Sequence, residues 1–181
     1  PADKKQIATT RTFAHDIDDF GELHQSVVQY AVACAEKLRQ QNSVCGEIVV
    51  FILTNRHKDN IPQHYESRLV KLSVPTDSTL ELTKYASGLL RQIYRKGYAY
   101  KRAGVILSDI SSKKGTQRDM FDTTDRDKHD RLMKTVDGLN ASFGRHKIVP
   151  AAAGMKFFRM NREHLSKKFT TDWENIIRVK T

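Results

Sequence analysis

Along this chain, segments in which hydrophobic and polar residues alternate, as in a strand, are followed by segments in which hydrophobic residues recur at helical spacing. Lys5 to Phe13 alternates and predicts a strand, and residues 20–41 show apolar side chains at helical spacing after the capping residue Asp19. Glu47 to Thr54 is short, apolar and rich in β-branched residues, which predicts a buried strand. A polar loop over Asn55 to Glu66 ends this half of the pattern.

The next segment repeats the pattern. Arg68 to Val74 predicts a strand that ends at Pro75, and residues 76–78 then cap a second helix that we expect to extend to a stop at Gly97. Tyr98 to Ile110 predicts the last strand. The order β-α-β-β-α-β is the split βαβ arrangement of an α+β fold, in which two helices cover one face of a four-stranded antiparallel sheet. The other face stays open, and we expect function there.

Alternation in the last strand assigns its side chains to the two faces of the sheet. Ala103, Val105 and Leu107 fall together and are expected under the helices, while Tyr100 and Arg102 fall on the open face. We therefore expect Arg102 to be exposed.

Beyond this predicted domain, residues 1–110, the chain becomes less regular. Residues 111–125 have the composition of a linker, and Arg126 to Asn140 predicts a third helix. Lys147 to Thr181 mixes aromatic residues with many cations. We therefore expect residues 126–181 to form either a small helical and irregular lobe or a tail that folds only with a partner.

The composition points to a polyanionic partner. Lys and Arg number 31 against 21 Asp and Glu, a net charge of +10, and 39% hydrophobic residues suffice for a packed core. The two cysteines, Cys34 and Cys45, form neither a disulfide framework nor a metal clip, which indicates reduced thiols and a cytoplasmic protein. The longest apolar run, residues 48–53, is too short to span a membrane. The start at Pro1 predicts a piece of a longer protein.

Catalytic and metal-binding patterns are missing from the sequence. The seven histidines lack ligand spacing, and we expect the carboxylates near Asp19 to cap the first helix rather than hold a metal. No glycine-rich phosphate loop or nucleophile elbow occurs. We therefore expect no enzyme activity and no cofactor in this chain.

Polar residues on the first and last predicted strands suit contacts to phosphates. Thr10, Arg11 and Thr12 lie on one strand and Lys101 and Arg102 on the other, and the two strands can share a surface. These five residues are the candidate DNA-binding set.

Five segments have a recognisable sequence: T-T-R-T-F-A at 9–14, Y-K-R-A-G-V-I-L-S-D-I at 100–110, R-D-M-F-D at 118–122, M-K-T-V-D-G-L-N at 133–140 and R-E-H-L-S-K-K-F-T-T-D-W at 162–173. Together they resemble the C-terminal region of UmuC-type Y-family translesion DNA polymerases. If the resemblance holds, residues 1–110 are the little-finger domain, which grips the template-primer backbone, and the palm carboxylates that hold magnesium lie upstream. It implies error-prone lesion bypass in the SOS response, with the sliding clamp, a processed UmuD-type dimer and RecA as partners.

The predicted linker contains a match to the clamp-binding pentapeptide of that family. Gln117 would place its amide in a polar subsite, and Met120 and Phe121 would fill an apolar cleft. Arg118 replaces the usual leucine, which predicts weaker binding.

Two alternatives stay open at this stage. Phe169 and Trp173 are candidate contacts to a protein partner, but they equally suit a small core of the lobe itself. The same β-α-β-β-α-β order also builds stand-alone, non-enzymatic RNA-binding modules of ferredoxin-like fold, which stack bases on aromatics of their central strands. Residues 101–105 lack such aromatics, and Phe51 stands alone in an apolar run.

Overall fold

The computed structural model describes residues 3–114, 122 and 124–154, and its elements follow the predicted order. They are β1 (Ile7–Ile17), α1 (Phe20–Gln40), β2 (Ser43–Thr54), β3 (Tyr65–Thr76), α2 (Thr79–Ile93), β4 (Tyr100–Ser112), α3 (Arg126–Phe143) and a 3-10 turn (Ala151–Ala153).

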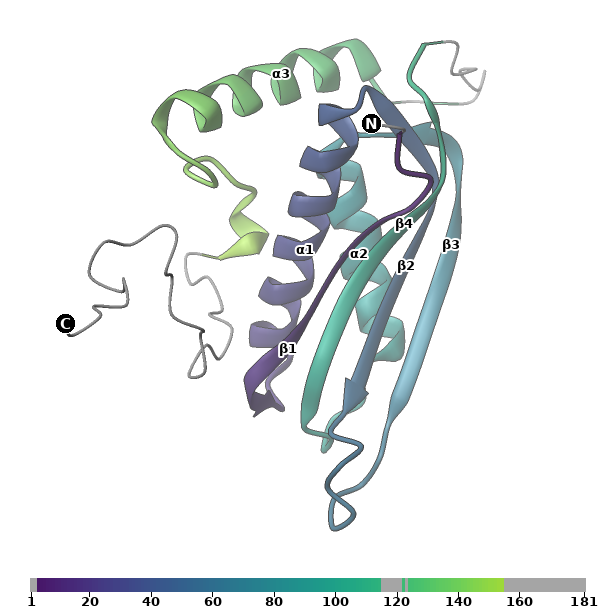
Figure 1. The fold of residues 1–181 in the computed structure, drawn as a ribbon, viewed down its shortest axis with the longest axis vertical. Helices are drawn as coiled ribbons and strands as arrows, with labels where there is room; N and C mark the ends of the chain where they lie inside the picture. The colour runs from purple at the N-terminus through teal and green to yellow at the C-terminus, as the bar shows by residue number, and fades with distance from the viewer. Residues whose placement is uncertain (1–2, 115–121, 123, 155–181) are drawn as a thin grey trace, which may run out of the picture.

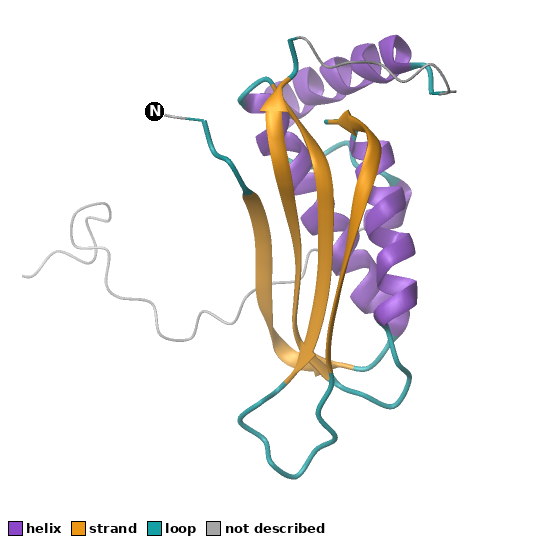
Figure 2. Cartoon of the chain, turned by 90° about the vertical axis from the view of Figure 1, so that its right-hand side faces the viewer, coloured by secondary structure: helices purple, strands orange, loops and turns teal. Residues whose placement is uncertain are grey.

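The four strands form one sheet in the order β1-β4-β2-β3, and every neighbouring pair is antiparallel. Figure 1 shows the two central strands flanked by β1 and β3. In Figure 2 both α1 and α2 lie on the same side of the strands, so the other face of the sheet is uncovered by helices. The predicted α+β, split βαβ fold is confirmed.

The start of α1 is as the sequence predicts. The Asp19 side chain accepts a hydrogen bond of 2.8 Å from the backbone N–H of Glu22, which satisfies a free donor of the first turn. The Glu22 carboxylate lies 3.1 Å from His15 Nε2. The N-terminal cap therefore fixes the point at which the chain turns from β1 into α1.

The end of α2 differs from the prediction, because the helix stops at Ile93 rather than near Gly97. Tyr94 is already extended, with φ −66° and ψ 135°, so Arg95 lies beyond the helix. The Tyr94 hydroxyl donates to the Asp18 carbonyl at 2.8 Å, and this contact anchors the side chain where the helix ends. Gly97 adopts φ 91° in the turn that follows, a conformation that favours glycine.

The core lies between the sheet and the two helices, and a polar cluster closes one end of it. Tyr100 is fully buried, and its hydroxyl accepts a hydrogen bond of 3.0 Å from the backbone N–H of Arg95 and lies 3.1 Å from His64 Nδ1. Burial lowers the pKa of His64 below its usual value of 6.5.

Cys34 and Cys45 are free and buried, and burial raises the pKa of the Cys45 thiol to about 12.

No helix in the described part of the chain combines the length and the apolar character that a membrane span requires.

Candidate nucleic-acid interface

The first and last strands lie side by side, as the phosphate-contact hypothesis requires. In the antiparallel register Thr10 pairs with Gly104 and Thr12 with Arg102. All four residues belong to the open face, since the alternate positions pair with residues buried under the helices. Arg102 is exposed, as predicted, and its Nη2 donates to Thr10 Oγ1 at 3.2 Å. Two hydroxyls and one guanidinium group therefore share a solvent-facing surface.

Gly104 lets an aromatic ring lie across β4. A Cβ at this position would fall 2.5 Å from Phe51 Cε1 and 2.5 Å from Thr10 Cγ2, closer than real Cβ contacts. The Phe51 ring of β2 thus covers the Gly104 backbone and meets the Thr10 methyl group. Glycine is required here by close approach.

Lys101 is a bulge in β4, which corrects the predicted orientation of Tyr100. Leu53 pairs with Arg102 and Thr54 pairs with Tyr100, so Lys101 has no partner on β2. The extra residue reverses the alternation, and Tyr100 points under the helices rather than onto the open face. The Lys101 ammonium group donates to the Ala14 carbonyl at 3.2 Å and lies 3.5 Å from Asp16, so β1 already engages it.

Arg11 lies on the opposite face of the sheet from Thr10 and Thr12. It pairs with Ala103, which is fully buried under the helices, so its side chain points to the helix side of the edge strand. Its charge acts on the hydroxyl of Tyr30 in α1. The five candidate residues therefore do not form one surface: Thr10, Thr12 and Arg102 do, while Arg11 and Lys101 lie apart from it.

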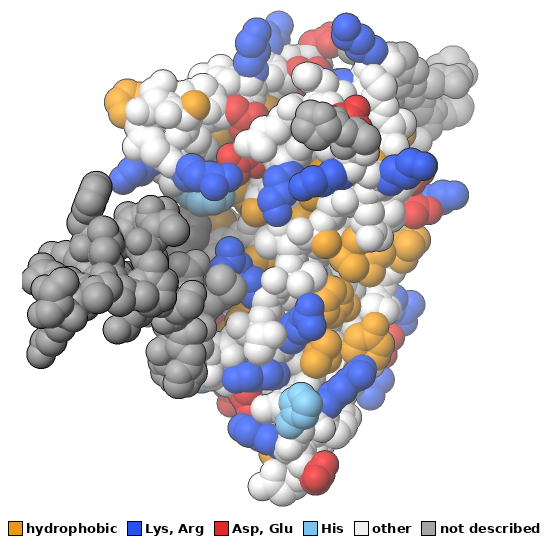
Figure 3. All heavy atoms as spheres, viewed as in Figure 1, with side chains coloured by type: hydrophobic (Ala, Val, Ile, Leu, Met, Phe, Trp, Pro, Cys, Tyr) orange, Lys and Arg blue, Asp and Glu red, His pale blue; other side chains and the backbone are white. Residues whose placement is uncertain are grey.

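The other half of the open face is apolar, which the sequence analysis missed apart from noting Phe51. Figure 3, which has the same view as Figure 1, shows apolar side chains gathered over β2 and β3 among lysines and arginines. Six side chains that are partly or fully exposed follow one another across the strand register, and we call them the apolar patch. They are Val49, Phe51, Leu53, Tyr65, Leu69 and Ile106.

Ion pairs and hydrogen bonds join α3 to the sheet domain. The Arg39 guanidinium of α1 makes two hydrogen bonds to Asp137 of α3, at 2.6 and 2.8 Å, and two more to the Asp77 carbonyl and Thr79 Oγ1. Lys113 lies between Asp77 and Asp130, at 2.7 and 2.8 Å. The predicted third helix exists and is longer than expected, because it continues to Phe143.

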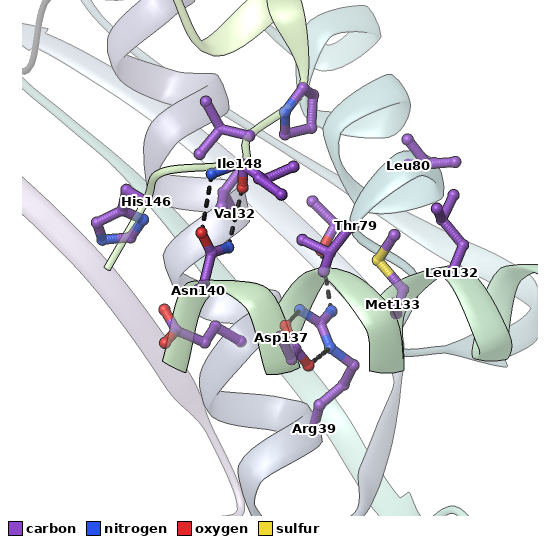
Figure 4. A pocket seen from close by; sticks show the side chains of 14 residues that line it. Val32, Arg39, Thr79, Leu80, Leu132, Met133, Asp137, Asn140, His146 and Ile148 are labelled. Atoms are coloured by element: carbon purple, nitrogen blue, oxygen red, sulfur yellow. Dashed lines mark hydrogen bonds and ion pairs between the residues drawn. The ribbon is translucent and has the colours of Figure 1, made fainter. Parts of the chain in front are cut away.

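An apolar cavity of about 180 Å³ lies beneath α3 (Figure 4). Leu80, Leu132 and Ile148 line it although each keeps about two fifths of its surface exposed. Asn140 closes one side, because its side-chain amide exchanges two hydrogen bonds with the backbone of Ile148, at 2.9 and 2.8 Å. Only Met133 of α3 is buried, so apolar packing contributes little to the docking of this helix.

Two sets of predicted contact residues lie outside the described part of the chain. These are the clamp-binding residues Gln117, Met120 and Phe121 and the partner-binding residues Phe169 and Trp173.

The described residues contain no group of three or more His, Cys, Asp or Glu side chains that could hold a metal ion. Of the predicted carboxylate cluster, Asp19 caps α1, and Asp16 accepts from Lys58 at 2.8 Å. That hydrogen bond lowers the pKa of Asp16.

Comparison with known families finds two matches in successive parts of the chain. Residues 4–120 match the impB/mucB/samB family C-terminal domain, and residues 130–179 match a domain of unknown function. The first match spans the sheet domain, and the second begins inside α3.

Curated relatives match along almost the whole chain. Protein ImpB of Salmonella typhimurium is 36% identical over 178 residues, which is 97% of this chain and 42% of that protein. Protein UmuC of Salmonella typhimurium is 35% identical over 98% of this chain and 42% of its own length. DNA polymerase IV of Clostridium acetobutylicum is 26% identical over 80% of this chain and 35% of its own length. The chain thus spans about two fifths of the length of ImpB and UmuC.

Solved structures resemble the fold at low sequence identity. An insertion ternary complex of Dbh DNA polymerase has a TM-score of 0.45 at 20% identity, over 59% of this chain and 29% of that one. The little finger domain of PolIV, in complex with the β-clamp processivity factor, has a TM-score of 0.41 at 14% identity, over 64% of this chain and 98% of that one.

Proposed function

Because this chain belongs to the impB/mucB/samB C-terminal domain family, we propose that it is the non-catalytic DNA-binding and partner-binding part of an error-prone translesion DNA polymerase, and that it works in the cytoplasm. The observation that carries the proposal is the surface formed by Thr10, Thr12 and Arg102 on adjacent strands. Hydroxyl and guanidinium groups in such an array bind phosphate oxygens without reading base sequence. The net charge of +10 draws the chain toward DNA.

The test is binding to labelled primer-template DNA, followed by fluorescence anisotropy over a range of salt concentrations. Arg102→Ala should weaken binding and reduce the dependence on salt, because one phosphate contact is lost. Arg91→Ala removes an equal charge from α2, on the helix side of the sheet, and should bind like the wild type. Equal weakening by both substitutions would show that only net charge matters and would refute the proposed surface.

Arg11→Ala tests whether the DNA reaches round the edge of the sheet. Since Arg11 points to the helix side, we expect a smaller loss than for Arg102→Ala. A larger loss would move the contact surface from the open face to the edge of β1.

Docking on a sliding clamp is the second part of the proposal. It rests on the match of residues 117–121 to the clamp-binding pattern, through Gln117, Met120 and Phe121. Purified clamp should bind the chain at micromolar strength, and a Met120→Ala, Phe121→Ala double variant should lose the binding. Unchanged binding by the double variant, with an unchanged circular dichroism spectrum, would place the clamp contact elsewhere.

Protein partners are the third part, and we propose a processed UmuD-type dimer and RecA, with Phe169 and Trp173 as contacts. The exposed apolar side chains around the α3 cavity support a protein contact at α3. Trp173 is the single tryptophan, so its fluorescence reports directly on the tail. A blue shift on addition of the dimer, absent in Phe169→Ala, is expected. Trp173 emission that is already blue-shifted in the free chain and does not change on addition of the dimer would mean that these residues form a core of the lobe itself.

A further inference from the structure

The apolar patch is poorly suited to the phosphate contacts proposed for the neighbouring half of the open face. The strand register makes the patch continuous: Leu53 pairs with Tyr65, and Val49 pairs with both Leu69 and Ile106. Tyr65 and Leu69 are each 55% exposed. An exposed apolar surface of this kind marks a contact with another molecule, and phosphate oxygens gain nothing from it.

Two aromatic rings give the patch a flat and rigid part. Phe51 lies across Gly104, so the sheet backbone supports the ring from below. On the neighbouring strand Phe51 pairs with Ser67, and Tyr65 lies two residues from Ser67 on the same face. The Arg56 guanidinium carbon lies 5.3 Å from the centre of the Tyr65 ring. Stacking of a base needs such a supported π surface beside a cation.

The charges at the border of the patch are complementary to a nucleic acid. Arg102 shares a register row with Leu53 and Tyr65, and Arg56 adjoins Tyr65. At the far end of the patch, the strand register brings one acidic side chain, Glu47, beside it. The Glu47 carboxylate lies 3.9 Å from the Lys71 ammonium group and accepts a hydrogen bond from the Ser108 hydroxyl. An apolar and aromatic centre with a cationic border matches a single nucleic-acid strand, which has exposed bases and a negatively charged backbone.

We propose that the apolar patch binds unpaired bases of single-stranded DNA, which stack on Phe51 and Tyr65 while Arg102 and Arg56 hold the adjoining phosphates. The inference rests on the proposed DNA-binding function and adds the kind of DNA that this half of the surface takes. Paired bases in a duplex are stacked on one another and offer no free face, so the patch distinguishes single strands from duplex. Stacking on aromatic rings is tolerant of sequence, as lesion bypass requires.

The experiment compares two ligands, a thymidine oligonucleotide of about 20 residues, long enough to exceed typical single-strand site sizes, and a duplex of the same length. Phe51→Leu and Tyr65→Leu remove the π surface but keep an apolar side chain of similar reach. Each should weaken single-strand binding about tenfold and leave duplex binding unchanged. Tyr85→Leu makes the same exchange at an exposed tyrosine of α2, on the helix side of the sheet, and is the matched control that should leave both affinities unchanged.

A direct readout identifies the stacked residues. An oligonucleotide with 5-iododeoxyuridine should crosslink to Phe51 or Tyr65 on irradiation, with the site read by mass spectrometry of the peptides. Crosslinks confined to other elements would overturn the proposal. Tyr65→Leu serves if Phe51→Leu disturbs the fold, because Tyr65 is largely exposed and its replacement has little effect on folding.

The outcomes separate this inference from the proposed function. Unchanged single-strand binding in both leucine variants would refute base stacking. If Arg102→Ala loses duplex binding in the same experiment, the proposed phosphate contacts stand, and the patch is better explained as a contact for a protein. Equal losses for single strand and duplex in the leucine variants would also refute base stacking. Selective loss of single-strand binding supports it even if Arg102→Ala leaves duplex binding unchanged, in which case only the phosphate surface fails.

Discussion

Replacing Arg39 by alanine should weaken the docking of α3 while the sheet domain stays folded. The Arg39 side chain is 11% exposed and donates four hydrogen bonds, two of them to the Asp137 carboxylate. Charge-assisted hydrogen bonds contribute about 1.5 to 3 kcal/mol each, but Asp137 is 35% exposed and regains water when the partner is removed. A net loss of about 2 kcal/mol in the docking free energy of α3 follows, while the Lys113–Asp130 ion pair and the buried Met133 remain.

Hydrogen exchange measures this loss locally. A change of 2 kcal/mol corresponds to about a 30-fold increase in the exchange rate of α3 amides, since each 1.4 kcal/mol is a factor of ten. Peptides from β2 are the internal reference and should keep their rates. Arg39→Lys retains the charge without the paired geometry and should fall between the wild type and Arg39→Ala.

Two results would refute the reasoning. An unchanged α3 rate would mean that the apolar contacts around the cavity hold the helix without the ion pair. An equal increase in α3 and β2 would mean that Arg39 stabilises the whole domain rather than this joint. A double-mutant cycle with Asp137→Ala then isolates the pair itself.

Three further predictions concern the stability of the sheet domain. Tyr100→Phe removes the hydroxyl of a buried side chain, which accepts from the Arg95 backbone N–H, and should cost about 1 to 2 kcal/mol in urea unfolding, whereas an unchanged urea midpoint would mean that water replaces the hydroxyl. Because burial lowers the pKa of His64, the unfolded chain binds more protons, so stability should be full above pH 6.5 and fall as the pH decreases toward the folded pKa. Urea midpoints at several pH values should show a smaller fall for His64→Asn, and parallel curves would contradict this. Gly104→Ala forces the Phe51 ring to move and should destabilise the domain by about 1 to 3 kcal/mol in the same assay, unless the ring relocates without loss.

Local sequence patterns predict the order of elements, the covered and open faces of the sheet, and the cap of α1. These features depend on local periodicity and capping chemistry, which neighbouring residues carry. The exposure of Arg102 followed from the same alternation. The end of α2 was misplaced because contacts of Tyr94 with a distant part of the chain override the local stop signal at Gly97.

Which side chains share a surface depends on the pairing of strands in three dimensions. The bulge at Lys101 reverses the alternation and buries Tyr100, and no residue type near it signals the change. In β2 the run from Ile48 to Leu53 is apolar at every position, so alternation could not show that Phe51 faces outward. That face is set by the pairing of strands far apart in the chain, and with it the separation of a polar half of the sheet from an apolar one.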